Sequence, residues 1–104
     1  MVKIIWTEPA LDDIHAIMEF IAQDSVYYAD ATARDIFNSS KRIKGFPLSG
    51  RIVPEFCDAT IREIICGSYR IIYKVLNSSC FVVSVIHASR DIIRHLTPDE
   101  WNDL

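Results

Sequence analysis

The spacing of apolar residues changes once along this chain, and that change restricts its possible folds more than any other feature. Between residues 7 and 45 apolar side chains recur every three or four positions, the period of an amphipathic helix. Between residues 60 and 88 they form three short runs rich in isoleucine, valine and tyrosine, which favour strands. Helices followed by strands indicate an α+β domain whose sheet packs one face on the helices.

The helical part divides into two helices at Asp24-Ser25. Thr7 can cap the first helix with its hydroxyl, and Ser25 can cap the second. We expect the second helix to end with Gly45 in a left-handed conformation, because Pro47 cannot continue it. One short break between them predicts an antiparallel hairpin. The second helix has the apolar stripe Tyr28 or Ala29, Ala33, Ile36, Phe37, Ser40 and Ile43.

Strands are predicted at residues 2–6, 60–66, 69–75 and 80–88, the last three joined by turns short enough for hairpins. Residues 46–58 contain two prolines and a glycine and predict a loop with room for one short strand. The order is therefore β-α-α-β-β-β, with an N-terminal helical hairpin packed on a mainly antiparallel sheet. A capping box at residues 97–100 adds the option of a short C-terminal helix.

Composition limits the class of protein. The 104 residues suffice for one domain, residues 1–104, and the net charge of −3 does not favour general attraction to a polyanion. Three widely spaced cysteines do not favour a metal site or a disulfide framework. The start lacks the pattern of a signal peptide, and the longest stretch without charge, residues 75–89, is too short and polar to span a bilayer. We expect a cytoplasmic domain without cofactor, metal or membrane contact.

Several basic residues lie near the ends of the predicted strands. Strict alternation places Val83, Val85 and His87 on one face of the last strand, opposite Ser84 and Ile86. Arg62, Arg70, His87 and Arg90 would then gather near one end of the sheet, although sequence leaves the strand register open. One interpretation is a phosphate pocket with His87 as acid or base.

The other interpretation of these residues is structural. Arg62 and Arg70 would pair with carboxylates such as Glu63, Asp58 or Asp91, and His87 would only end a strand. The carboxylates Asp12, Asp13 and Asp24 are interpreted as solvated helix charge. The sequence contains no Ser-His-Asp order, glycine-rich phosphate loop or paired-histidine motif, so conventional hydrolase or nucleotide chemistry is not indicated.

Five segments, in order, resemble the RelE/ParE toxin family of type II toxin–antitoxin systems. Residues 6–14 resemble the family's first strand and helix start, and the central resemblance is carried by residues 47–55, 61–64 and 67–73. The closing segment, residues 87–91 (His-Ala-Ser-Arg-Asp), resembles the family's His-x-x-Arg ending. The likeness covers roughly residues 2–92. It implies a growth-arresting toxin that a cognate antitoxin neutralises in a hetero-oligomer, the antitoxin's flexible tail folding on contact.

The family's members differ in target. RelE-like members cut messenger RNA in the ribosome, whereas ParE-like members poison DNA gyrase without a nuclease site. Lysines of the RelE-like pattern fall on Ile61 and Glu63 here, and the net charge is −3, so the resemblance favours the ParE-like branch associated with plasmid stabilization. A ribosome-dependent endoribonuclease remains the alternative, with Glu55, Arg70, His87 and Arg90 as its catalytic set. A third hypothesis is a degenerate member that binds antitoxin but has lost toxicity. Candidate contacts to target or antitoxin are Arg62, Arg70, Tyr73, Arg94 and Trp101.

Overall fold

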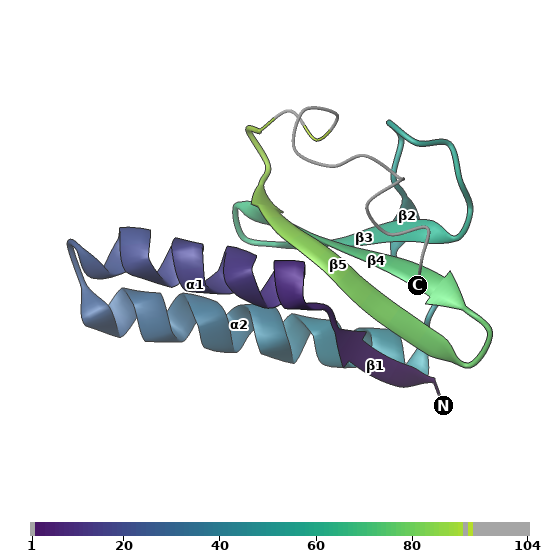
Figure 1. The fold of residues 1–104 in the computed structure, drawn as a ribbon, viewed down its shortest axis with the longest axis horizontal. Helices are drawn as coiled ribbons and strands as arrows, with labels where there is room; N and C mark the ends of the chain where they lie inside the picture. Colours follow the sequence, from purple (N-terminus) through teal and green to yellow (C-terminus); the bar gives the residue numbers. More distant parts are fainter. Residues whose placement is uncertain (1, 91, 93–104) are drawn as a thin grey trace.

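A helical hairpin packs against one face of a five-stranded sheet in the computed structural model, which describes residues 2–90 and 92 (Figure 1). The helices are α1 (Glu8–Ala22) and α2 (Val26–Gly45). The strands are β1 (Lys3–Trp6), β2 (Arg51–Ile52), β3 (Ile61–Cys66), β4 (Tyr69–Leu76) and β5 (Ser79–His87). The predicted order of elements is confirmed, and the loop after α2 holds the short strand β2. The candidate C-terminal helix lies outside the described residues.

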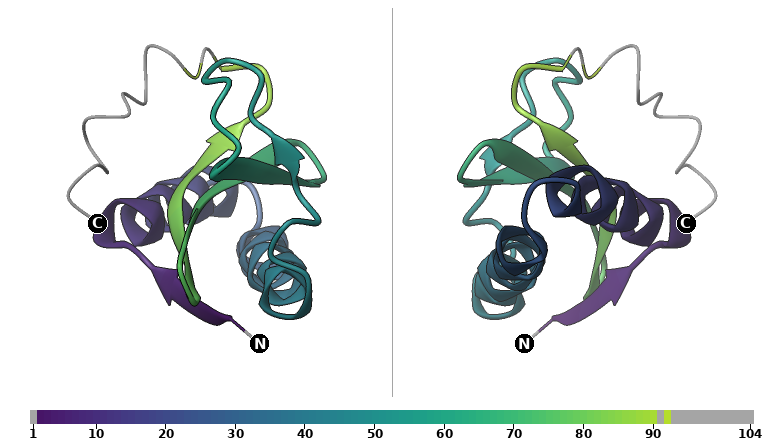
Figure 2. Two further views of the ribbon diagram at one scale, coloured as in Figure 1. Left: turned by 90° about the vertical axis from the view of Figure 1, so that its right-hand side faces the viewer. Right: turned by 90° about the vertical axis from the view of Figure 1, so that its left-hand side faces the viewer.

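The sheet has the order β1-β5-β4-β3-β2. β1 runs parallel to β5, and the other neighbouring pairs are antiparallel. Strands β3, β4 and β5 follow one another through short turns, whereas β1 precedes the hairpin in the chain and pairs with the last strand, β5. Figure 2 shows both helices on the same side of the curved sheet. The mainly antiparallel sheet is therefore confirmed. Neither described helix combines the length and apolarity needed to cross a membrane.

Local capping starts both helices where the sequence predicts. The Thr7 hydroxyl accepts from the Ala10 N–H at 3.4 Å, and the Ser25 hydroxyl accepts from the Tyr28 N–H at 3.2 Å. The end of α2 differs from expectation. Gly45 is helical and does not have a positive φ, and Phe46 caps the helix with φ −138° while its N–H donates to the Arg42 carbonyl. The left-handed glycine predicted there is wrong, because the chain leaves the helix through an extended residue.

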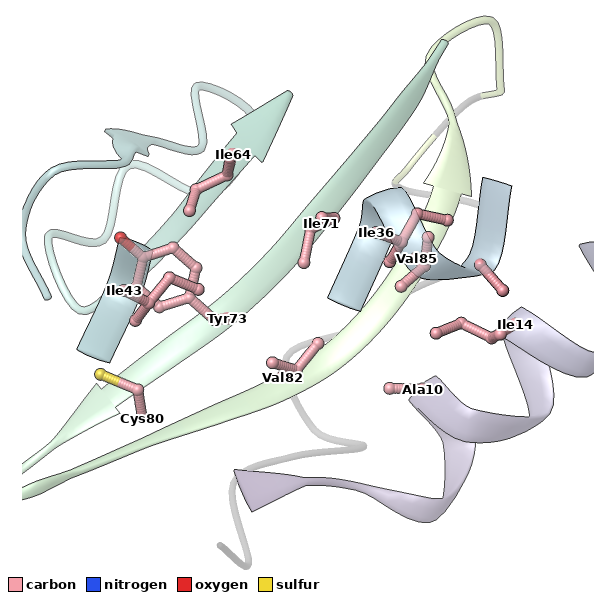
Figure 3. Packing of buried hydrophobic residues seen from close by; sticks show 11 residues of the cluster. Ala10, Ile14, Ile36, Ile43, Ile64, Ile71, Tyr73, Cys80, Val82 and Val85 are labelled. Atoms are coloured by element: carbon pink, nitrogen blue, oxygen red, sulfur yellow. The ribbon is translucent and has the colours of Figure 1, made fainter. Parts of the chain in front are cut away.

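Two apolar clusters lie on opposite faces of the sheet. The larger one joins the hairpin to the sheet, and Figure 3 shows Ile43 of α2 beside Tyr73 of β4 and Ile36 of α2 beside Val85 of β5. Fully burying an aliphatic side chain of this size stabilises the fold by about 1.5–3 kcal/mol. The smaller cluster covers the other face and comprises Val53, Ile61, Ile72, Val83, Ile86 and Ile92. The segment between β2 and β3 therefore gives the second face its own cover.

A β-bulge changes which residues of β5 face the helices. Ile72 pairs with Ser84, but the next residue, Tyr73, pairs with Val82, so Val83 is an extra residue in β5. Val82 and Val85 both belong to the cluster under the helices. The strict alternation predicted for this strand is wrong, because one inserted residue reverses the inward and outward positions beyond it.

Asp13 of α1 accepts hydrogen bonds from the part of β5 that lies beyond the end of β1. β1 pairs with β5 only as far as Trp6 opposite Val82. Further along, one Asp13 carboxylate oxygen accepts from the Val85 N–H at 3.0 Å and from the Ser84 hydroxyl at 2.8 Å. The interpretation of Asp13 as solvated charge is wrong, because its carboxylate takes the place of a neighbouring strand.

Candidate functional site

Arg70 lies on the face of the sheet opposite the helices, with only 6% of its surface exposed. Its Nη1 and Nη2 donate to the two carboxylate oxygens of Glu55, each at 3.0 Å. Its guanidinium also lies 2.6 Å from Oε1 of Glu63. These carboxylates, Glu55 first, raise the pKa of Arg70 further above its usual range. Arg70 is therefore a permanent buried cation held by two anions.

Glu63 extends these contacts into a network of four residues. Its side chain is buried in β3, and its Oε2 accepts from Nε of Arg51 in β2. The Arg51 side chain is 61% exposed and that of Glu55 is 30% exposed, so both ends of the network reach solvent. The hydrogen bond from Arg70 holds the pKa of the Glu55 carboxyl below its usual value. We call Arg51, Glu55, Glu63 and Arg70 the ion network.

The ion network is neutral and ties the β2 region to the centre of the sheet. It holds two cations and two carboxylates, so the charge of each buried group is compensated. Nε, Nη1 and Nη2 of Arg70 all bind carboxylate oxygens. A phosphate would have to displace Glu55 or Glu63 from this arginine. The arrangement therefore directly supports a structural role for Arg70, as the cation that pairs with Glu55 and Glu63.

Tyr73 and Arg62 hold the loop that precedes β2. The fully buried Tyr73 hydroxyl donates to the Pro47 carbonyl at 2.8 Å and accepts from the Gly50 N–H at 3.0 Å, and burial raises its pKa. Arg62 donates to the carbonyls of Leu48, Gly50 and Ala59 at 3.0–3.1 Å. Both side chains, predicted from sequence as contacts to target or antitoxin, bind the backbone of this chain.

His87 lies on the helix side of the sheet, away from Arg70. It pairs across the strands with Tyr69, and the two rings meet edge to face with centroids 5.5 Å apart. Arg70 pairs with Ile86 instead, so it faces the other way. The expected cluster of Arg62, Arg70 and His87 at one sheet end is therefore wrong. Neighbouring residues of a strand point to opposite faces of the sheet, so Arg70 and His87 lie on different faces. Arg62 pairs with Tyr73, three residues further along β4 than Arg70.

The remaining candidates take no part in the ion network. The Nδ1 atom of His87 accepts from the Ser89 N–H at 3.1 Å and lies 2.7 Å from the Ser89 hydroxyl. Arg90 is exposed and forms no ion pair with the described residues. Arg94 and Trp101 lie outside the described residues. Of the proposed catalytic set, the structure brings together only Glu55 and Arg70.

The structural interpretation of the arginines holds in part. Arg70 binds Glu63 as that interpretation expected, but Arg62 binds carbonyls rather than carboxylates. Sequence reasoning missed Arg51 as the outer partner of Glu63. Its signal was the Gly-Arg pair that opens β2, whose position opposite β3 becomes visible only in the sheet. Within residues 2–90 and 92, no cluster of three or more histidine, cysteine or acidic side chains is arranged to hold a metal ion.

Comparison with known families and structures extends this picture. Residues 4–92 match the model of the ParE toxin of the type II toxin–antitoxin system parDE. The chain belongs to the ParE toxin family. It is a type II toxin–antitoxin toxin of the ParE/RelE superfamily, with the hairpin and sheet order described above.

Relatives of this ParE-family toxin carry both superfamily names. Toxin RelE2 of Caulobacter vibrioides is 31% identical over 91 residues, which cover 86% of this chain and 99% of the relative. The fold resembles a chain of the chromosomal ParDE system from P. aeruginosa, with a TM-score of 0.71, 17% identity, and coverage of 84% and 96% of the two chains. It also resembles a chain of the toxin–antitoxin complex RelBE2 from Mycobacterium tuberculosis, with a TM-score of 0.54, 16% identity, and coverage of 83% and 96%.

Proposed function

We propose that this toxin arrests growth by binding DNA gyrase, and that its own side chains break no bond. One observation carries the proposal: Arg70 is buried and bound by Glu55 and Glu63, while His87 lies on the opposite face. A nuclease of this size would need an arginine free to stabilise developing charge on a phosphate, and an acid or base within hydrogen-bond reach of the same atom.

Electrostatics supports a protein target over RNA. The chain has a net charge of −3, and Glu63 stands where the RelE-like pattern has a lysine. Binding to phosphate-rich surfaces gains most of its affinity from cations that displace counterions. The pairing of Arg70 with Glu55 and Glu63 leaves no net positive charge on the ion network to attract RNA phosphates. A gyrase-directed toxin acts in the cytoplasm, and in a plasmid-borne pair its growth arrest would favour cells that keep the plasmid.

We further propose that a cognate antitoxin neutralises this toxin in a hetero-oligomer. The structures that share the fold belong to a ParDE toxin–antitoxin system and to the toxin–antitoxin complex RelBE2. Exposed apolar side chains are spread over several elements of the chain, and an extended or helical antitoxin segment could cover some of them. Co-expression with the protein encoded by the adjacent gene, followed by size-exclusion chromatography, tests this partnership.

Supercoiling of relaxed plasmid by purified gyrase tests the target. We expect inhibition or trapped DNA cleavage in the presence of the toxin, and the same effect from the His87→Ala variant, because that residue has no chemical task in this mechanism. Heat-unfolded toxin serves as the negative control. No effect from a large molar excess of folded toxin would overturn the gyrase assignment.

A second candidate function is ribosome-dependent cleavage of messenger RNA. The observation that favours it is the bidentate pair between Glu55 and Arg70, which places a partly exposed carboxylate beside an arginine. In this mechanism the 2′-oxygen attacks the adjacent phosphorus while Glu55 takes the hydroxyl proton and Arg70 stabilises the developing charge. The bond from phosphorus to the 5′-oxygen of the next nucleotide breaks, which leaves a 2′,3′-cyclic phosphate, and water protonates the departing 5′-oxygen. Primer extension on messenger RNA from translating ribosomes would then show cuts with the wild-type toxin and none with Glu55→Gln.

A further inference from the structure

Four large apolar side chains are exposed together where the two helices meet. Phe20 lies near the end of α1, and Val26, Tyr27 and Tyr28 are the first three residues of α2. Between 65% and 76% of each of these residues is exposed. The rings of Tyr27 and Tyr28 meet edge to face with centroids 5.5 Å apart. We call these four residues the hairpin tip. Figure 1 shows this end of the hairpin projecting beyond the sheet.

The hairpin tip lies in the acidic part of the molecule. Residues 8–35 contain seven acidic side chains and one arginine, whereas residues 36–74 contain three acidic side chains and seven lysines or arginines. Glu19, Asp24 and Asp30 are the acidic residues nearest the tip in sequence, and all three are exposed. In the described part of the chain, no carboxylate of residues 8–35 forms an ion pair. The tip therefore presents aromatic surface among uncompensated negative charges.

Folding alone does not account for this combination. Glu19 lies in the last turn of α1, where the helix dipole favours cations, and that turn contains no basic residue. Exposed aromatic rings and unpaired like charges add no stability to the isolated domain. The end of α2 differs, since Arg42 and Lys44 in its last turn suit the dipole. Residues that lower the stability of the isolated domain are found most often at functional sites. The hairpin tip is therefore a stronger candidate for a binding surface than the C-terminal end of α2.

We propose that the hairpin tip docks a cationic, apolar segment of the protein that this toxin inhibits, an inference that rests on the proposed function. Lysine or arginine side chains of the partner stack on the rings of Tyr27, Tyr28 and Phe20, while the carboxylates around them complement the charge. Aromatic rings are well suited to this task because they bury a large area and lose little conformational freedom. Binding is expected to weaken as salt concentration rises, because the complementary charges lie at the surface.

The test compares two variants in which exposed residues are replaced by glutamine. The tip variant combines Phe20→Gln, Tyr27→Gln and Tyr28→Gln, and the control variant combines Phe46→Gln and Leu48→Gln at the other end of α2. All five side chains are largely exposed, so both variants should keep the Tm of the wild type. We expect the tip variant to need at least about tenfold more protein than the wild type for half-inhibition of gyrase. The control variant should match the wild type, and the tip variant should also lose growth arrest in cells.

The outcomes separate this inference from the proposed function. If the wild type and the folded tip variant inhibit gyrase equally, the docking inference is overturned and the gyrase assignment stands. If the wild type does not inhibit gyrase, the assignment fails and growth arrest decides the inference. Arrest by the wild type and the control variant but not by the tip variant then supports docking to another target. Arrest by all three, or by none, overturns it.

A charge reversal provides an independent check of the chemistry of the partner. Glu19→Lys combined with Asp30→Lys keeps the aromatic rings and changes only the charges around them. We expect this variant to inhibit gyrase less at low salt, with a difference from the wild type that shrinks as salt rises. Equal or stronger inhibition by the charge-reversed variant would refute a cationic partner segment.

Discussion

Replacement of Arg70 by methionine distinguishes a structural ion network from a catalytic arginine. Methionine fills much of the same space without charge. In the wild type, Arg70 compensates the buried carboxylate of Glu63, which has no access to solvent. Without the arginine, that carboxylate keeps only its contact with Arg51, whose side chain is largely exposed. The variant should therefore be destabilised mainly through the charge that remains behind.

The size of the effect follows from these contacts. Removing one partner of a buried ion pair typically costs about 3–5 kcal/mol. Arg51 still contacts Glu63, and the partly exposed Glu55 can turn toward water, so we expect about 2–4 kcal/mol for Arg70→Met. For a domain of this size, a loss of about 3 kcal/mol lowers Tm by roughly 12 °C or more. Adding Glu63→Leu removes the stranded charge, so the double variant should be more stable than Arg70→Met alone.

Urea denaturation followed by circular dichroism measures these free energies, and growth arrest on induction measures toxicity. The urea midpoint of Arg70→Met should fall by about 1–2 M, given typical slopes for small domains. Arg70→Lys is the matched control, because it keeps the charge but loses the bidentate geometry. Its free energy of unfolding should lie between those of the wild type and Arg70→Met. A fully stable Arg70→Met protein that has lost toxicity would refute the structural argument and make the arginine a chemical group.

Three further predictions concern the loop, the sheet edge and acid stability. Gly50→Ala should lower Tm, because its Cβ would lie 2.6 Å from the Tyr73 hydroxyl, and an unchanged melting curve would contradict this packing. Asp13→Ala should cost about 1–3 kcal/mol and speed hydrogen exchange at the Val85 amide, whereas Asp13→Asn, which keeps an acceptor, should cost less. Because its arginine partner lowers the pKa of Glu55, the stability from this pair is present above the ordinary value of 4.5 and is lost as pH falls below it. Glu55→Gln should flatten that part of the pH–stability curve measured in urea, and an unchanged curve would argue against the pairing.

Much of the fold could be predicted from short-range patterns. Thr7 and Ser25 begin the helices as expected, because a capping hydroxyl binds an N–H only three residues away. The order of helices and strands followed from the change in apolar spacing. Apolar residues recur with the period of a helix or a strand because one side of each element is buried. The partnership of Arg70 with Glu63 was also within reach of the sequence, since a buried arginine needs a carboxylate and one lay on the preceding strand.

Only the tertiary structure decided which of these residues meet. The extra residue Val83 reverses the alternation of β5, and nothing local marks it as a bulge. The pairing of Tyr69 with His87 and of Arg70 with Ile86 sends the histidine and the arginine to opposite faces. These relations depend on strand register, which is set by contacts between residues far apart in sequence, and a shift of one residue exchanges the two faces of a strand. Sequence therefore determined the elements and the family resemblance, whereas the register determined that Arg70 and His87 lie on opposite faces of the sheet.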